Sequence, residues 1–177
     1  MTVAVAAPML SRGSFFRAAV VLVPALLLCG GLVARLAGST EDNAWYQSLI
    51  LPALQPPGPA FGIAWSILYT LLGLSAALVW ASPVPGRGRA LLLFGIGFAV
   101  NLCWSPLFFD AHLVAAALAV IVVMLLLAIA TTFAFARVNR LAAWLLLPYM
   151  LWLGFAGALN AHILVLNPMA DAMQLGI

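Results

Sequence analysis

The chain has 177 residues, of which 67% are hydrophobic and only 6% are charged. A soluble domain carries about 25% charged residues, so the composition excludes a soluble globular protein. The formal charge of +3 comes from seven arginines without any lysine, and we expect no nucleic-acid partner from it. The apolar runs are long and continuous rather than alternating, which predicts an all-α integral membrane protein in a lipid bilayer.

The length leaves room for five spans at about 20 residues per crossing, which predicts a five-transmembrane-helix bundle. We expect a head at residues 1–16, a membrane domain at 17–167 and a tail at 168–177. The predicted spans cover about residues 17–37, 60–80, 90–109, 113–135 and 141–166. Arg17 before an apolar run is also typical of a secretory signal, but no small-residue cleavage site precedes Arg35, so we expect a span there.

The longest connection, residues 38–60, contains four prolines in eight residues, which favours an extended path over a helix. Trp45 and Tyr46 precede these prolines, and such amphipathic rings are typical of the membrane interface. Two interpretations stay open here. The segment is either an aromatic belt with a linker, or a lid over one mouth of the bundle.

The second and third spans each carry an aromatic residue with a polar companion on one helical face. Trp65 and Tyr69 are four residues apart, and Asn101, Trp104 and Phe108 fall within about 60° of each other. A polar amide inside the bilayer needs a partner, so Asn101 either joins helices or faces a cavity.

Small residues mark two faces for close helix packing. Gly73 and Ala77 offer such a contact in the second span. Gly95 and Ala99 lie opposite the face of Asn101, and we expect a homodimer through them.

The fifth span contains one stripe of four residues. Tyr149, Trp152, Ala156 and Asn160 follow a spacing of 3, 4 and 4 residues and lie within about 80° of helix surface. Together with the faces of the second and third spans, the stripe predicts a cavity lined by indoles for a planar hydrophobic molecule. Ordinary packing of tryptophan in a small membrane protein is the alternative.

The charges predict the orientation. With five spans, one side of the membrane holds six arginines and no acid, and the other holds the four acids with Arg35. Short positive loops stay in the cytoplasm, which predicts a cytoplasmic N-terminus and an outside C-terminus. We expect a bacterial inner membrane, with the outer membrane as the alternative.

Several kinds of site are not supported. The spans contain no carboxylate for a proton relay, and Cys29 and Cys103 lack metal-ligand spacing. His162 lies off the stripe, and His112 is expected in a solvated turn, so we expect no metal. We find no P-loop, no dinucleotide fingerprint and no nucleophile–base pair.

The order of motifs across residues 18–167 resembles the TspO/MBR family, the tryptophan-rich sensory proteins and translocator proteins. The motifs are Trp45-Tyr46-x-x-Leu49, Pro52 with Pro56-Pro57, Ala64-Trp65-x-x-Leu68-Tyr69, Asn101-x-x-Trp104-x-Pro106-x-Phe108-Phe109, Pro148-Tyr149-x-x-Trp152 and Leu159-Asn160. Each is weak alone, but their order and spacing together are specific.

The resemblance implies a five-helix bundle, often dimeric, whose cavity binds porphyrins such as protoporphyrin IX. By position, the family's cavity residues match Trp65, Asn101, Trp104, Tyr149, Trp152 and Ala156. Trp65 and Trp152 match the tryptophans linked to light- and oxygen-dependent porphyrin breakdown in similar bacterial proteins.

The chain also departs from the family pattern. Leu51 stands where the first loop usually has lysine, and Ala53 and Leu54 stand where tryptophan is common, so we expect the lid to bind a propionate or ring less well. The end of the fifth span lacks the tyrosine and the following basic residue of the proposed cholesterol motif, so we do not expect cholesterol as a partner.

Three functions follow from the residues and the resemblance. The first is a tetrapyrrole-binding membrane protein in sensing, sequestration or transport, which needs a porphyrin or haem-like ligand but no cofactor. The second is a porphyrin-degrading photo-oxidase that uses Trp65 and Trp152. The third is a structural protein with an incidental cavity. The predicted ligand-binding residues are Trp45, Tyr46, Trp65, Tyr69, Asn101, Trp104, Phe108, Tyr149, Trp152, Ala156 and Asn160.

Overall fold

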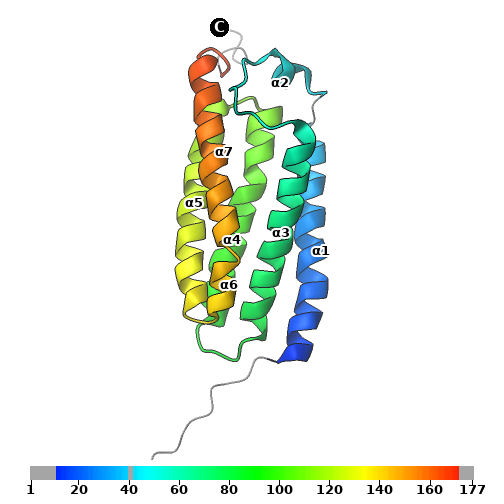
Figure 1. Cartoon of the computed structure of the whole chain (residues 1–177), viewed down its shortest axis with the longest axis vertical. Helices are drawn as coiled ribbons and strands as arrows, with labels where there is room; N and C mark the ends of the chain where they lie inside the picture. The colour runs from blue at the N-terminus through cyan, green and yellow to red at the C-terminus, as the bar shows by residue number, and fades with distance from the viewer. Residues whose placement is uncertain (1–10, 40–41, 172–177) are drawn as a thin grey trace, which may run out of the picture.

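The computed structural model describes residues 11–39 and 42–171, which form helices joined by turns and loops (Figure 1). Within these residues, the helical segments long and apolar enough to cross a membrane are five: Arg12–Leu36, Gly58–Ala81, Arg87–Asp110, Val114–Ala136 and Arg140–Leu166. The predicted all-α membrane bundle is therefore confirmed. Residues 1–10 of the expected head, Glu41 of the first loop and residues 172–177 of the expected tail lie outside the described residues.

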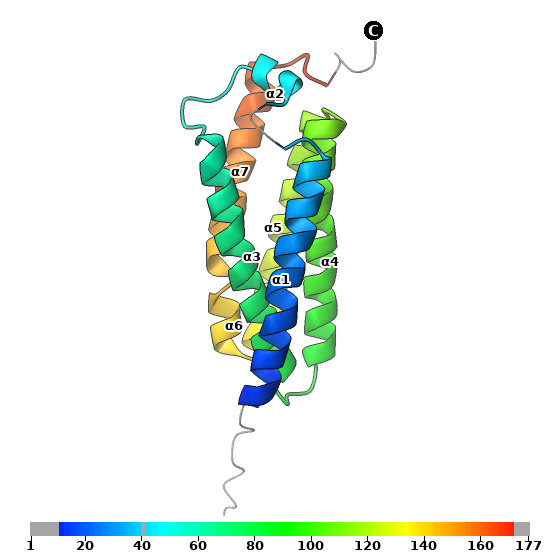
Figure 2. The same cartoon turned by 90° about the vertical axis from the view of Figure 1, so that its right-hand side faces the viewer.

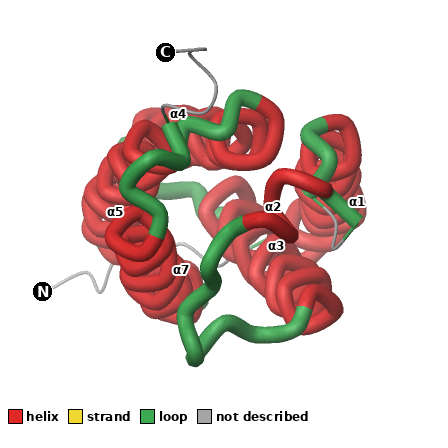
Figure 3. Tube along the Cα trace, turned by 90° about the horizontal axis from the view of Figure 1, so that it is seen from above, coloured by secondary structure: helices red, strands yellow, loops and turns green. Residues whose placement is uncertain are grey.

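The five spans form a ring. Their helices are α1 (Arg12–Leu36), α3 (Gly58–Ala81), α4 (Arg87–Ser105) continued by the π-helix η1 (Pro106–Asp110), α5 (Val114–Ala136), and α6 (Arg140–Trp144) followed by α7 (Leu147–Leu166). Seen along the bundle, the order around the ring is α1, α3, α7, α5 and α4 (Figure 3). Extensive packing joins α1 to α3, α4 to α5 and α5 to α7, whereas α7 touches α3 at few points.

Two prolines interrupt the spans. Proline removes a backbone donor and its ring collides with the carbonyl four residues earlier, which breaks a regular helix. Pro148 follows the short break that separates α6 from α7, so the span expected as one helix is two helices in line. Pro106 begins the π-helical turn, in which the Ala111 amide bonds the Pro106 carbonyl at 2.8 Å.

Glycines hold α1 against α3. A Cβ on Gly73 would lie 2.8 Å from the Cα of Val23, and one on Gly30 would collide with the ring of Tyr69. The close packing predicted at Gly73 is therefore present, and its partner is α1. Such backbone approach gives van der Waals contact where lipid removes the hydrophobic driving force between helices.

The two ends of the bundle, whose helices and connections can be followed in Figure 2, differ in their charged residues. One end carries the start of α1, the α3–α4 connection and the α5–α6 turn. We call it the arginine-rich end, because it holds Arg12, Arg17, Arg87, Arg89, Arg137 and Arg140. The other end, the loop end, carries α2 (Ala44–Ser48), the proline-rich loop and the end of α7.

Candidate functional site

Asn101 lies at the centre of a polar bridge between three helices. Its side chain is 5% exposed. Its Oδ1 accepts a hydrogen bond from the Tyr69 hydroxyl of α3 at 2.8 Å, and its Nδ2 donates to the Tyr149 hydroxyl of α7 at 3.2 Å. A buried amide in a membrane is costly without partners, and both of its ends are satisfied here. The bridge joins α3 and α7 through α4.

Asn160 makes a second bridge, nearer the loop end. It is 2% exposed. Its Oδ1 accepts from the Trp104 indole at 3.2 Å, and its Nδ2 donates to the Val114 carbonyl at 2.9 Å. This amide therefore ties α7 to α4 and to the start of α5, and it orients the indole of Trp104.

Aromatic rings fill the space between α3 and α7. We call this set the aromatic seam: Phe61, Trp65 and Tyr69 of α3 with Tyr149, Trp152 and Phe155 of α7. The Trp65 ring lies 6.3 Å from Trp152 at 78° and 6.4 Å from Tyr149 at 61°. Phe61 and Phe155 flank Trp152 at 5.8 and 5.6 Å. The seam lies where backbone contact between neighbouring helices is weak.

Trp152 contains an unmet hydrogen-bond donor. Its indole Nε1 is buried and has no acceptor among the described residues. Leaving a buried donor unpaired costs roughly 1–3 kcal/mol. An acceptor atom brought into the seam would remove this cost, so the seam suits a polar atom on an otherwise apolar molecule. The indole Nε1 of Trp45 in α2 is unpaired in the same way among the described residues.

Trp45 and Tyr46 of α2 pack onto the loop end of the bundle rather than outward. Trp45 stacks on His112 with ring centroids 4.2 Å apart and contacts Phe108 at 5.4 Å. Tyr46 contacts Phe108 and Phe109 at 6.4 and 5.5 Å. We call these five residues the end cluster. His112 adopts φ 55° and is half-buried in this stack, so it lies in a turn as expected, but its ring is only partly open to solvent.

Hydrogen bonds hold the loop against this cluster. The side chain of Asn167, just after α7, accepts from the Ile50 amide and donates to the Ile50 carbonyl, each at 2.9 Å. Asn43 donates to the Phe109 carbonyl at 3.3 Å. Between the two alternatives left open for this segment, the packing favours a lid: α2 and the loop cross the end of the bundle (Figure 3).

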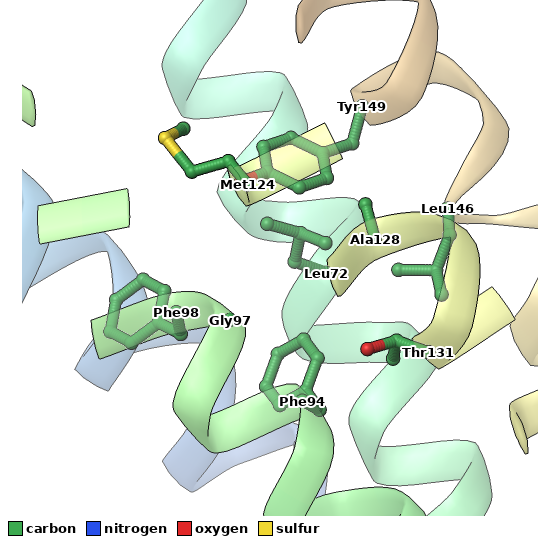
Figure 4. Close-up of a pocket in the computed structure, with 9 residues that line it drawn as sticks. All are labelled: Leu72, Phe94, Gly97, Phe98, Met124, Ala128, Thr131, Leu146 and Tyr149. Atoms are coloured by element: carbon green, nitrogen blue, oxygen red, sulfur yellow. The ribbon is translucent and has the colours of Figure 1, made fainter. Parts of the chain in front are cut away.

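A small cavity lies deeper in the bundle, on the arginine-rich side of Tyr149. Its volume is about 20 Å³, enough for one water molecule. Figure 4 shows its lining: Leu72, Phe94, Gly97, Phe98, Met124, Ala128, Thr131, Leu146 and Tyr149. Among the predicted site residues only Tyr149 lines it, and a planar macrocycle does not fit.

The predicted residues gather in two places. Trp65, Tyr69, Asn101, Tyr149 and Trp152 meet at the aromatic seam and its amide bridge. Trp45, Tyr46, Phe108, Trp104 and Asn160 meet at the loop end, where Trp104 stacks on Phe108 at 5.2 Å. Ala156 lies on α7 between them and is half-buried.

Sequence reasoning missed four residues that shape these sites. Phe61 and Phe155 are one helical turn from Trp65 and Trp152, so helical spacing contains the signal for both. Asn167 and Gln55 act through the folded loop, where Gln55 donates to the Tyr46 hydroxyl at 2.7 Å. No spacing rule indicates such contacts. Over residues 11–39 and 42–171, no three His, Cys, Asp or Glu side chains gather as a metal site.

Comparison with known proteins places these features in a family. The sequence model of the TspO/MBR family matches residues 19–166. The chain is 38% identical to the protein CrtK of Rhodobacter capsulatus over 75% of this chain and 86% of that one. It is 38% identical to the tryptophan-rich protein TspO of Chlorobaculum tepidum, covering 81% and 96%, and 36% identical to the human translocator protein, covering 68% and 73%.

The chain belongs to the TspO/MBR family. All residues of the aromatic seam and the end cluster lie inside the matched segment, from Trp45 to Phe155. The five-span membrane architecture of this TspO/MBR protein therefore carries both candidate sites, and the family resemblance noted in the sequence is confirmed.

Proposed function

We propose that this TspO/MBR protein binds a tetrapyrrole such as protoporphyrin IX inside the membrane, in sensing, sequestration or transport. Family membership supports the ligand class. One observation carries the location: the buried Nε1 of Trp152, without an acceptor among the described residues, in a seam made of rings. A flat macrocycle offers ring faces for stacking and polar edge atoms for that donor.

Binding requires the seam to open. Ligand pockets usually measure about 300–1,000 Å³, whereas the cavity beside Tyr149 holds about 20 Å³. The seam is suited to opening because α7 and α3 share little backbone contact there. When the rings of Trp65 and Trp152 separate, each can stack on the ligand instead of on the other. Asn101 reaches the ligand only by exchanging one of its tyrosine partners.

Fluorescence quenching by protoporphyrin IX in detergent tests the proposal. We compare wild type with Trp152→Phe, which removes the unmet donor, and with Trp144→Phe, whose indole is 67% exposed on α6 away from the seam. We expect saturable quenching whose Kd rises roughly tenfold for Trp152→Phe and is unchanged for Trp144→Phe. Linear quenching that is identical in all three proteins would mean partitioning into micelles, and would leave the structural hypothesis.

Porphyrin degradation is the second candidate function. The observation that favours it is the pair of indoles of Trp65 and Trp152, 6.3 Å apart, on which a bound excited porphyrin would rest. Illumination in oxygen is expected to yield a new pigment with wild type but not with Trp65→Phe/Trp152→Phe. The control is Trp80→Phe/Trp144→Phe, because both of its indoles are exposed. Bleaching at the rate of free porphyrin would rule this activity out.

The charge asymmetry supports an N-terminus in the cytoplasm of a bacterial inner membrane. Six arginines lie at one end, and the described acids Asp42, Asp110 and Asp171 lie at the other. Cysteines introduced at Pro83 and at Ser48 report the orientation through a membrane-impermeant maleimide in a background without Cys29 and Cys103. We expect label at position 48 alone in intact spheroplasts, and label at position 83 alone would reverse the topology.

The outer face of α4 supports a homodimer. Gly95 and Ala99 are exposed, and a Cβ on Gly95 would meet no atom within 4 Å. Ala99→Trp is expected to convert a dimer to a monomer in light-scattering measurements, whereas Ala119→Trp on the exposed face of α5 leaves the mass unchanged. A dimer in both variants would place the interface elsewhere.

A further inference from the structure

A groove runs along the outside of the bundle at the arginine-rich end, far from the aromatic seam. Its volume is about 290 Å³. We call it the α1–α3 groove, and its lining is Ser14, Arg17, Ala18, Val21 and Leu22 of α1 with Trp80 of α3. The five α1 residues follow spacings of three and four, so they form one helix face.

The packing of α1 on α3 explains where the groove lies. Gly73 lets α3 approach the backbone of Val23. Trp80 follows Gly73 by seven residues, two helical turns, and therefore returns to the same face of α3. At Trp80 this face carries a large indole that is 58% exposed, whereas at Gly73 it carries no side chain. The surface beside this indole is an apolar channel that leads toward the start of α1.

Arg17 gives the groove a positive charge without a counter-ion. Its Nε donates to the Gly13 carbonyl of its own helix at 3.3 Å, and no described hydrogen bond or salt bridge uses its two terminal nitrogens. The described acids Asp42, Asp110 and Asp171 belong to segments at the opposite end of the bundle. The Ser14 hydroxyl also has no hydrogen-bond partner within residues 11–39 and 42–171.

Arg87 occupies two backbone carbonyls at the end of α3, next to the Trp80 side of the groove. The free carbonyls at the end of α3 would attract a cation. Arg87 already donates to the carbonyls of Trp80 and Ser82 at 3.1 and 3.2 Å. A second guanidinium thus lies next to the groove, and the field at its mouth is positive.

We propose that the α1–α3 groove binds one anionic phospholipid from the leaflet that meets the arginine-rich end. The lipid phosphate bonds Arg17 and Ser14, and an acyl chain lies along the apolar channel beside Trp80. An arginine–phosphate pair in a partly apolar place is a strong charge-assisted contact. Exposed indoles are common at the headgroup level of membranes, which agrees with the position of Trp80.

Native mass spectrometry of the full-length, delipidated protein tests the proposal by titration with palmitoyl-oleoyl-phosphatidylglycerol. We expect one tight site in wild type and roughly tenfold weaker binding in Arg17→Gln. The matched control is Arg89→Gln, an exposed arginine of the same end that does not line the groove. It is expected to change the affinity less than twofold. Equal losses in both variants would mean general attraction to a positive surface and would overturn the proposal.

Two further arms separate a lipid site from an anion site. Val21→Trp fills the channel but keeps every charge, and we expect it to weaken lipid binding as much as Arg17→Gln does. Phosphatidylcholine is expected to bind at least tenfold more weakly than phosphatidylglycerol, and 50 mM inorganic phosphate is expected to leave the bound lipid in place. Full binding in Val21→Trp, equal binding of phosphatidylcholine, or displacement by phosphate would each contradict the proposal. Thermal unfolding of each variant checks that the protein remains folded.

Discussion

Helix α3 contacts α1 and α7 in opposite ways. On one side, Gly73 brings its backbone against the backbone of α1 at Val23, and Gly30 of α1 leaves room for the Tyr69 ring of α3. On the other side, rings and two hydroxyls separate it from α7, and the amide of Asn101 spans the gap. At the α1–α3 interface the helices pack too closely for a ligand to replace any side-chain contact. The second interface is made of groups that a flat ligand with polar edges can replace.

This difference assigns the two interfaces different tasks. Close-packed helices transmit strain and tolerate little volume change, so the α1–α3 interface holds α3 in place. The aromatic seam has an unmet donor at Trp152 and few backbone contacts, so under the proposed function we expect α7 to be the helix that moves. The comparison predicts that mutations at the first interface change stability most, and that mutations at the second change ligand binding most.

The largest expected loss of stability comes from adding a side chain at Gly30. Gly30→Leu would collide with the Tyr69 ring and should lower the free energy of unfolding by about 3 kcal/mol, the upper range for overpacking. Its neighbour gives the control, because a Cβ on Gly31 meets no atom within 4 Å. Gly31→Leu should change the value by less than about 0.5 kcal/mol. Unfolding in mixed detergent and SDS measures both, and equal losses would contradict close packing at Gly30.

A smaller loss is expected from removing the amide bridge. Asn101→Leu leaves two buried tyrosine hydroxyls without their partner, which should cost about 2 kcal/mol. Adding Tyr69→Phe and Tyr149→Phe removes the unpaired groups, so the triple variant should be more stable than Asn101→Leu alone. The same unfolding assay measures this. A triple variant that is less stable than the single one would mean that the tyrosines contribute by other contacts.

The sequence predicted which residues share a face but not how far each helix is turned. The spacing of Asn101, Trp104 and Phe108 identifies an inward face because helix geometry is regular. The partners of Asn101 depend on the ring order of five helices, which no local pattern encodes. The sequence left two interpretations of the indole faces open, a cavity or ordinary packing. In the structure the rings of the seam pack on each other.

Breaks and turns in the chain could also be predicted only in part from the sequence. Pro148 inside the fifth span contains the signal for the break between α6 and α7, because proline disrupts a helix in a known way. The stack of His112 on Trp45 depends instead on the turn between η1 and α5, where His112 itself adopts φ 55°. A positive φ is uncommon outside glycine and is not indicated by composition.

Asn167→Ala is expected to have the smallest effect on stability. It is also the variant that best tests how the ligand enters the bundle. This variant removes both hydrogen bonds to Ile50 and should cost about 1 kcal/mol while speeding hydrogen exchange in residues 49–57. Asn139→Ala is the control, since it removes the cap of α6 at the other end, with a similar cost. It should leave exchange in the loop unchanged. Slow exchange in Asn167→Ala would mean that the aromatic contacts of the end cluster hold the loop by themselves.

Stopped-flow quenching by protoporphyrin IX in the same two variants then locates the entrance. If the loop covers it, the association rate rises in Asn167→Ala and not in Asn139→Ala, because only the first releases the loop. If the ligand enters between α3 and α7 from the bilayer, the rate stays the same while exchange in the loop rises. In that case the weak backbone contact along the seam, rather than the lid, controls access of the ligand. The α3–α7 interface would then open to admit the ligand, whereas the α1–α3 interface stays closed.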